Sequence, residues 1–233
     1  MSVIIDKKTT PEIIGTLEKL NINYIKTEEI STLYEAVSTH PDMQIHFVTE
    51  TCAVAAPAVY NYYKSTLPSR ITLHCGTANP GSTYPDSCAY NVAKLGKKVI
   101  GNLSYTDKKI IELYASMDIE FINVKQGYTK CNLCIVSENA VITEDEGLLK
   151  VLSAYGIEVL KITPGSIRLK GFDYGFIGGA SGFIAPGKLA FTGDITTHPE
   201  YKTIKSFINS HSADIIKLSS TKVDDFGSIL YLP

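Results

Sequence analysis

The feature that most constrains the fold of this chain is an internal repeat of one short unit. Residues 98–100 form an apolar run, and Thr106-Asp107 is a helix N-cap signal. Residues 108–117 then place apolar side chains at helical spacing, and residues 119–122 alternate as a strand does. This part of the sequence therefore predicts a strand, a cap, a helix and a second strand, in that order.

Four further copies of the unit occur elsewhere in the chain. Each has an apolar run, a capping residue or proline, a helical stretch and a closing apolar segment. The spacing is uneven, roughly 42–53 residues, which lies in the range of repeat architectures. The further copies span residues 3–25, 45–75, 140–160 and 189–218.

An inner strand is predicted ahead of each unit, joined to it by a tight turn. Asn, Gly and Pro residues at these turns favour hairpins. The last inner strand has a partner only in the N-terminal run, residues 3–5, so we expect the two ends of the chain to pair in one sheet. Such pairing closes a ring and removes the open sheet edge. The predicted inner strands are residues 34–37, 89–92, 133–136, 182–185 and 229–232.

These units predict an α/β protein in which residues 1–233 form a single domain of five ββαβ-like repeats. The simplest assembly is a five-fold pseudo-symmetric α/β propeller, with the N- and C-terminal strands closing one blade. The competing interpretation is an open doubly wound α/β sheet, which also alternates strands and helices. That sheet explains neither the hairpins nor a last strand without a helix, and no linker or low-complexity stretch divides the chain.

Charge and composition limit the partners. A formal net charge of −2 provides no basic field for nucleic acid or for an anionic membrane surface. No apolar run approaches the roughly 20 residues of a membrane span, and Asp6 within the first apolar run argues against a signal peptide. The five cysteines are expected to be mostly reduced, which indicates a cytoplasmic location. The oligomeric state stays open.

The five pseudo-repeats resemble the pentein fold, over essentially the whole chain. That family of five-bladed α/β propellers includes arginine and agmatine deiminases, dimethylarginine hydrolases, amidinotransferases and the non-catalytic ribosome anti-association factor. The resemblance implies a site on the axis of the ring. There a cysteine near the C-terminus attacks a guanidinium carbon, a histidine acts as acid and base, and two carboxylates hold the guanidinium.

The usual cysteine and histidine of that family are missing. Gly227 and Ser228 stand where the resemblance places the nucleophile, and residues 129–132 contain no histidine. The chain therefore resembles a divergent member of the pentein superfamily, and its catalytic competence stays open.

Other groups near the predicted axis are candidates for chemistry. Residues just before the inner strands are small and mostly polar, which suits five strands converging around a ligand. Cys131 is the first candidate nucleophile, because the charge of the neighbouring Lys130 favours a thiolate. Cys88, in the equivalent turn of another unit, is the second. The alternative for both is a buried, inert thiol.

Five further residues are predicted to bind a substrate at the axis. An inward pair of aspartates can hold a guanidinium or an amine by charge-assisted hydrogen bonds. The alternative for the aspartates is a structural turn before a strand. The predicted partner is a small polar or cationic molecule. The predicted substrate-binding residues are Asp86, Asn132, Ser181, Asp225 and Ser228.

The histidines and the remaining motifs predict no metal and no cofactor. No two histidines have a ligand spacing such as HxH, and there is no phosphate-binding glycine loop. His40 lies in a predicted hairpin turn and is expected to be solvated. His46 lies on a strand and faces either the axis or solvent. Cys134, although it forms a CxxC pair with Cys131, is expected to be a small core residue.

Two functions follow from these expectations. The first is a hydrolase-like enzyme that modifies an amidino or guanidino group of a small nitrogen-rich substrate, with Cys131 or Cys88 as nucleophile. The second is a non-catalytic pentein-fold protein with a degraded active site, which binds a protein, a ribosomal surface or a small molecule. Because a fold hosts many functions, the residues of the site have to decide between them.

Overall fold

The computed structural model describes residues 1–232 as a mixed α/β protein with five three-stranded sheets. In each sheet the middle strand pairs antiparallel with one neighbour and parallel with the other. The sheet orders are β15-β1-β2, β3-β4-β5, β6-β7-β8, β11-β10-β9 and β12-β13-β14. The strands are β1 (Ser2–Ile5), β2 (Asn23–Lys26), β3 (Ile45–Thr49), β4 (Cys52–Ala55), β5 (Thr72–Cys75), β6 (Ala93–Leu95), β7 (Lys98–Gly101), β8 (Glu120–Asn123), β9 (Cys134–Ser137), β10 (Ala140–Thr143), β11 (Glu158–Lys161), β12 (Ser181–Ala185), β13 (Lys188–Phe191), β14 (Asp214–Lys217) and β15 (Leu230–Leu232).

A helix follows each middle strand and returns the chain to the parallel outer strand, as a parallel pair requires. Two of these helices begin at predicted caps, where the side chains of Asp107 and Asp145 accept hydrogen bonds from backbone N–H groups of the first turn. The helices are α1 (Pro11–Lys19), α2 (Tyr60–Thr66), α3 (Lys108–Ala115), α5 (Glu146–Ala154) and α6 (Tyr201–Ser210), and a single turn, α4 (Thr129–Asn132), precedes β9.

The helices attach to the sheets through a repeated apolar pattern. Four of them bury two apolar side chains that lie four residues apart, and such side chains share one helix face. Four of the five units therefore build their part of the core in the same way. The pairs are Ile13 and Leu17, Ile110 and Tyr114, Leu148 and Leu152, and Ile204 and Ile208.

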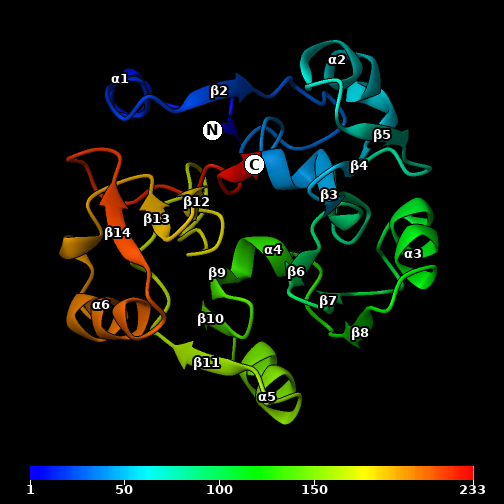
Figure 1. The fold of residues 1–233 in the computed structure, drawn as a ribbon. Coiled ribbons are helices and arrows are strands. Elements are labelled where there is room, and N and C mark those ends of the chain that lie inside the picture. Colours follow the sequence, from blue (N-terminus) through cyan, green and yellow to red (C-terminus); the bar gives the residue numbers. More distant parts are fainter. Residues whose placement is uncertain (233) are drawn as a thin grey trace.

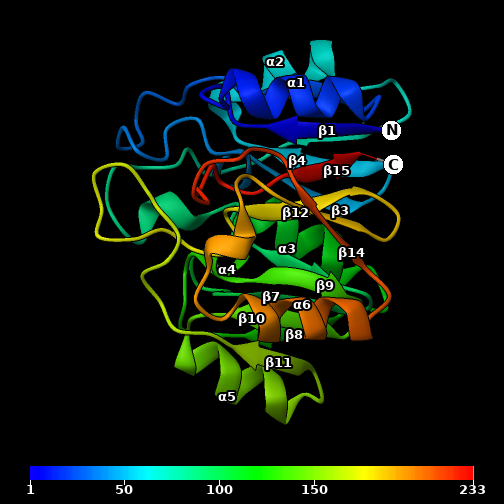
Figure 2. The ribbon, with the colours of Figure 1, turned by 90° about the vertical axis from the view of Figure 1, so that its left-hand side faces the viewer.

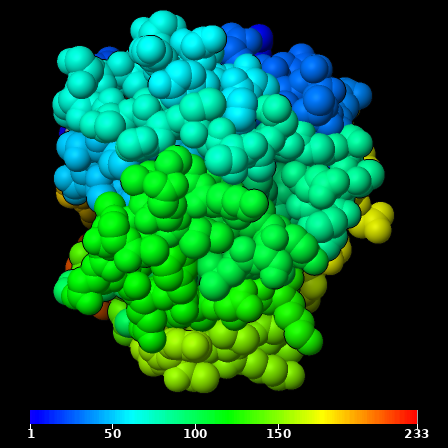
Figure 3. Space-filling model, turned by 90° about the vertical axis from the view of Figure 1, so that its right-hand side faces the viewer, coloured from blue at the N-terminus to red at the C-terminus, as the bar shows by residue number. Residues whose placement is uncertain are grey.

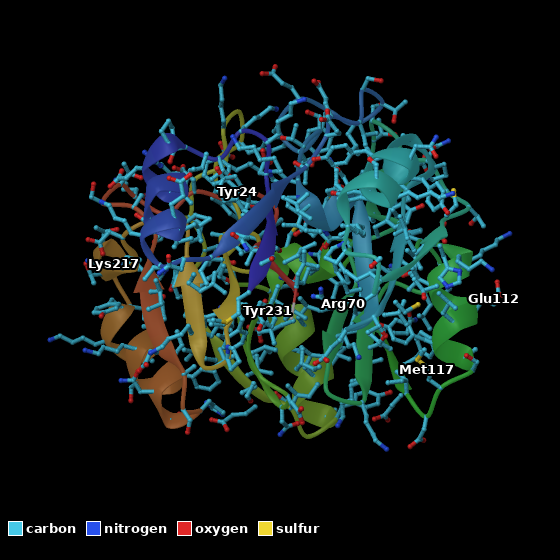
Figure 4. All side chains as sticks on the ribbon, turned by 45° about the horizontal axis from the view of Figure 1, so that its top comes forward. Tyr24, Arg70, Glu112, Met117, Lys217 and Tyr231 are labelled. Atoms are coloured by element: carbon cyan, nitrogen blue, oxygen red, sulfur yellow. The ribbon has the colours of Figure 1, made fainter. Side chains whose placement is uncertain are left out.

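Helices lie at the outside of the molecule, and one strand of each sheet lies nearer the middle. Figure 1 shows β3, β6, β9 and β12 toward the centre, near the chain end formed by β15. Tyr231 of β15 lies centrally in Figure 4, whereas Lys217 and Glu112 lie at the periphery. Both termini lie at one end in Figure 2, and long connecting loops lie at the other. On the outer surface in Figure 3, the segments around α2 and α3 form one continuous face.

The two ends of the chain pair in one sheet, as the sequence predicts. β1 runs antiparallel to β15, with Val3 opposite Tyr231 and Ile4 opposite Leu230. Ile4 and Leu232 are fully buried in the same hydrophobic cluster. The last three described residues are therefore part of the core and of the sheet.

Two predicted inner strands are wrong. Residues 34–37 form turns, and the inner strand of that sheet is β3, which pairs with β4 across the two-residue loop Glu50-Thr51. That loop has none of the Asn, Gly or Pro residues that mark a tight turn, so the usual turn signals do not indicate a hairpin within residues 45–55. Similarly, residues 89–92 are not a strand, and β6 begins only at Ala93.

No helix within residues 1–232 has the length and apolar character needed to cross a membrane.

The C-terminal strand should contribute strongly to stability. Leu232→Ala removes a fully buried side chain from the core and should lower the free energy of unfolding by about 2–4 kcal/mol. Leu20→Ala is the control, because Leu20 is 43% exposed, and its cost should stay within about 0.5 kcal/mol. Urea denaturation followed by circular dichroism measures both. Equal, small effects would mean that the terminal pairing is dispensable.

Candidate functional site

Five residues, one ahead of the inner strand of each sheet, meet at the middle of the molecule. Each lies two or three residues before its strand begins, and hydrogen bonds link them into one group. We call this group the axial cluster. Its members are Asp42, Asn91, Cys131, Gly178 and Ser228.

Asp42 is the hub of the axial cluster. The Cys131 thiol donates to Asp42 Oδ2 at 3.1 Å, and the Ser228 hydroxyl donates to the same oxygen at 2.7 Å. The second carboxylate oxygen, Oδ1, is buried and has no hydrogen-bond partner. Asp42 itself is 1% exposed. One carboxylate thus holds a thiol and a hydroxyl from two distant parts of the chain and keeps an oxygen available.

Two further side chains complete the hydrogen bonding around Cys131 and Ser228. Asn91 binds Cys131 twice: its Nδ2 donates to the sulfur at 3.0 Å, and its Oδ1 accepts from the Cys131 backbone N–H at 3.1 Å. Lys130 Nζ donates to Ser228 Oγ at 2.9 Å. Lys130 and Ser228 therefore touch at positions where the pentein resemblance places the histidine and the cysteine.

The backbone around the axial cluster is packed so closely that small residues are required. A side chain at Gly178 would have its Cβ 2.5 Å from the carbonyl oxygens of Lys130 and Leu133. Ser228 has a φ of +74°, which is unusual for a residue other than glycine and often marks a functional site. The predicted small residues ahead of the inner strands therefore reflect this convergence.

A cavity of about 240 Å³ borders the axial cluster and receives side chains from all five inner strands. Asp42, Lys94 and Lys130 contribute charged groups, and most of the remaining lining is apolar. His46 also lines it, and its Nε2 lies 2.7 Å from the Tyr114 hydroxyl. Burial and the positive charge of Lys94 lower the pKa of His46 to about 3, so this imidazole is neutral at physiological pH.

Neither candidate thiol is ionised at neutral pH in this environment. Burial raises the pKa of Cys131 well above its usual range, and the charges of Asp42 and Asp225 raise it further. Burial raises the pKa of Cys88 to about 11. The expected lowering of the Cys131 pKa by Lys130 is therefore outweighed by burial and by two carboxylates.

The remaining predicted site residues lie at different places. Ser181 lines the cavity and donates to the Ile177 carbonyl, and Asn132 is buried with its amide on the Tyr128 carbonyl. Asp86 is exposed at a separate surface pocket. Because β6 begins later than predicted, Asp86 and Cys88 lie well before the start of that strand and outside the axial cluster.

His40 is buried, not solvated as the turn position predicts. It is 2% exposed and packs against Gly227, whose carbonyl accepts a hydrogen bond from the Asp42 backbone N–H. Since β3 is the inner strand, the segment before it enters the centre of the molecule and carries His40 with it. Asp225, also buried, lies 3.9 Å from His40 Nδ1.

Sequence reasoning missed Asp42, Asn91 and His40. All three precede inner strands that the sequence analysis placed too early. They were therefore not among the residues compared just before each predicted inner strand. If residues 45–55 are read as a hairpin turning at Glu50-Thr51, Asp42 aligns with Cys131 and Ser228. The alternation of small and apolar residues in that run is the signal that was available.

No group of three or more His, Cys, Asp or Glu side chains in residues 1–232 is arranged to hold a metal ion. Cys134 is fully buried in a hydrophobic cluster, as expected for a core cysteine.

Solved structures with similar folds include an amidinotransferase, a DDAH and an agmatine deiminase. SxtG, an amidinotransferase from Microseira wollei, aligns over 94% of this chain and 88% of its own, with a TM-score of 0.55 and 12% identity. The DDAH from Pseudomonas aeruginosa, complexed with citrulline, covers 97% and 92%, with a TM-score of 0.57 and 10% identity. The agmatine deiminase from C. jejuni covers 94% and 75%, with a TM-score of 0.51 and 11% identity.

These neighbours are pentein-superfamily members, so the chain has a pentein-type fold, as its repeats suggest. A family model described as "Family of unknown function (DUF6873)" matches residues 4–230. The chain therefore belongs to this family. No curated protein matches the sequence.

A buried glutamate next to this region predicts how stability depends on pH. Burial raises the pKa of Glu144 to about 7, although its Oε2 accepts a hydrogen bond from the Ile177 N–H at 3.1 Å. A carboxyl group with a raised pKa in the folded state stabilises the protein while it is protonated, and this stabilisation is lost as pH rises from about 4.5 to about 7.

Glu144→Gln removes that titration. Between pH 5 and pH 8 the wild-type free energy of unfolding should fall relative to that of the variant, by up to about 3 kcal/mol. Urea titrations of both proteins at the two pH values measure the difference. Parallel pH profiles would show that Glu144 does not titrate in this range.

Proposed function

We propose that the protein is a hydrolase-like enzyme that modifies an amidino or guanidino group of a small nitrogen-rich molecule, with the axial cluster as its active site. The observation that carries this proposal is Asp42, a buried carboxylate with one oxygen that has no partner. Such an oxygen is costly to bury, and an amidinium N–H placed against it offsets the cost. The amidino and guanidino chemistry of the structural neighbours supports the substrate class.

The proposal includes the arrangement that the repeats predict. Residues 1–233 are taken as a single domain in which the five sheets are the blades of a five-fold pseudo-symmetric propeller. The hydrogen bonds that join one residue of every sheet in the axial cluster support this arrangement. The partner is a small molecule in the cytoplasm, with no nucleic acid, membrane or cofactor required.

The charged residues that line the axial cavity indicate which charged groups the ligand carries. Lys94 and Lys130 line the same cavity as Asp42, so a purely cationic ligand would meet two like charges. A molecule with an amidinium at one end and an anionic or acceptor group at the other satisfies both signs. The apolar side chains of the inner strands suit a short aliphatic segment between them.

Cys131 is the nucleophile in this proposal, and the two oxygens of Asp42 have separate roles. Oδ1 holds the amidinium, while Oδ2, already 3.1 Å from the sulfur, takes the thiol proton. The sulfur then forms a bond to the amidino carbon, the carbon–amine bond breaks, and Asp42 returns the proton to the leaving amine. A water molecule next attacks the same carbon, the carbon–sulfur bond breaks, and the sulfur recovers a proton as the free thiol. A bound cation also opposes the effect by which Asp42 raises the Cys131 pKa. Cys88, which lies outside the axial cluster, is the weaker candidate.

A non-catalytic binding protein is the second candidate function. The raised pKa of Cys131 favours it, as does the set of hydrogen-bond partners of that sulfur, which in residues 1–232 holds an amide and a carboxylate but no imidazole. Under this alternative Asp42 binds the same kind of ligand, and no covalent bond forms.

Alkylation with two matched reagents tests the proposal. Chloroacetamidine carries a positive charge, and chloroacetamide is its neutral counterpart of the same shape. At pH 7.5, roughly as in the cell, chloroacetamidine should modify Cys131 at least about 10-fold faster, because about 1.4 kcal/mol of differential binding gives a factor of ten. Peptide mass spectrometry measures the rates, with the exposed Cys75 as the internal reference.

Asp42→Asn provides the matched control variant. It removes the charge that selects the amidinium, so the preference for chloroacetamidine over chloroacetamide should fall to about 1. If chloroacetamidine stabilises the fold but never modifies Cys131, the non-catalytic function is favoured. If neither reagent distinguishes wild type from the variant, the axial cluster does not bind amidines.

A further inference from the structure

A second, larger cavity of about 730 Å³ lies apart from the axial cavity and shares no lining residue with it. Loops line it, at the segments that follow β1, precede β3, and lie before β12 and β15. These residues come from regions far apart in the sequence, which the terminal pairing and the axial cluster bring together. Its lining includes Asp6, Tyr34, His40, Arg168, Phe172 and Asp225.

A histidine between two aspartates forms the floor of this cavity. His40 Nε2 lies 3.9 Å from Asp6 Oδ2, and His40 Nδ1 lies 3.9 Å from Asp225 Oδ1. Both distances are too long for hydrogen bonds. The three side chains are at most 3% exposed. His40 Nδ1 has no hydrogen-bond partner, so a buried polar nitrogen that lines the cavity is unsatisfied.

The two carboxylates are held mainly by hydrogen-bond donors, and the cationic side chains of the cavity lie farther away from them. Asp6 accepts from the Thr39 hydroxyl and the Lys8 backbone N–H, and Asp225 accepts from backbone N–H groups of Phe176 and Gly227. Within residues 1–232, neither forms an ion pair with lysine or arginine. Burial raises the pKa of both carboxyl groups, although the neighbouring His40, and Lys8 in the case of Asp6, oppose this rise.

The mouth of the cavity is aromatic. The rings of Tyr34 and Phe172 lie 5.5 Å apart, and Phe172 is 53% exposed. Arg168 is already bound to Asp224 on the wall, so its charge is not available to the floor. Aromatic faces attract cations and also accept aliphatic chains. The cavity thus combines an anionic floor with an aromatic entrance, while Lys8, bound to the Glu35 carbonyl, and Lys170 line other parts of it.

We propose that this loop-side cavity is a second ligand site, which binds a small aliphatic primary amine. The ammonium group lies between His40 Nδ1 and Asp225 Oδ1, and its alkyl chain lies against Tyr34 and Phe172. An ammonium offers three N–H donors at one point, which suits an imidazole nitrogen without a partner and a carboxylate 3.9 Å from it. The proposal does not rest on the function assigned to the axial cluster, because the two cavities have different linings.

Thermal unfolding and calorimetric titration with three probes of equal chain length test the proposal. n-Butylamine and 1,4-diaminobutane should raise the unfolding temperature and bind with a measurable stoichiometry of one, because a ligand that binds only the folded state stabilises it. n-Butanol, which lacks the charge, should bind at least about 10-fold more weakly. If neither amine binds, or if butanol binds equally well, the proposal is overturned.

Asparagine variants separate a ligand site from a structural cluster. Asp6→Asn and Asp225→Asn keep the size of the side chain and an acceptor oxygen, and each should weaken amine binding at least about 10-fold. Each variant also loses one acceptor oxygen for a buried donor, so the unfolding temperature of the free protein should fall, and the amine affinity is measured at a temperature where each variant is folded. A lower unfolding temperature with unchanged amine affinity would mean that the carboxylates serve the fold and would overturn the site.

Two control variants show in which cavity the amine binds. Asp86→Asn removes a carboxylate that lines a separate surface pocket and should leave the amine affinity within about two-fold of wild type. Asp42→Asn, in the axial cluster, acts on Asp225 only through charge and should change the amine affinity less than Asp225→Asn does. If Asp42→Asn abolishes amine binding while Asp225→Asn does not, the amine occupies the axial cavity and the second site is refuted. Failure of Cys131 alkylation, by contrast, has no bearing on this result.

Discussion

Backbone pairing between the two ends of the chain is the constraint on which the rest of the structure depends. β15 has no helix and no unit of its own, and it belongs to a sheet only because β1 receives it. That pairing places Ser228, just before β15, against Asp42, which is 186 residues away in sequence. Both cavities also take residues from the C-terminal segment. Without this contact the C-terminal members of both sites would have no fixed position.

The axial cluster shows what happens when converging strands leave room only for small side chains. The chain fills the centre with one carboxylate, one amide, one thiol, one hydroxyl and one glycine, and these groups hydrogen-bond to each other. A single carboxylate binds two donors through one oxygen, and the other oxygen is left over. A polar centre of this kind is under-satisfied by its own residues, and a ligand can therefore complete it.

Much of the architecture could be predicted from the sequence because helical spacing and capping are local properties. The buried pairs of α1, α3, α5 and α6 and the Asp107 cap follow from residues a few positions apart. The pairing of β1 with β15 followed from counting strands.

The residues of the candidate site were harder to predict from the sequence, because their identification depends on where each inner strand begins. The inner strands of two sheets were predicted too early, at residues 34–37 instead of β3 and at residues 89–92 instead of β6, and these errors hid Asp42 and Asn91. Cys131 and Ser228 lie beside correctly placed strands and were found. Burial of His40 could not be read from its turn-like neighbours, since packing against Gly227 is a long-range contact.

The union of the two ends in one sheet has a consequence for chain connectivity. Since β1 and β15 are already neighbours, the arrangement of the sheets does not depend on where the chain begins and ends. A short peptide joining the termini, combined with a new opening in an exposed loop such as that between β11 and β12, would give a circularly permuted chain with every strand pair preserved. The same arrangement of strands in space is therefore compatible with more than one order of the strands along the chain.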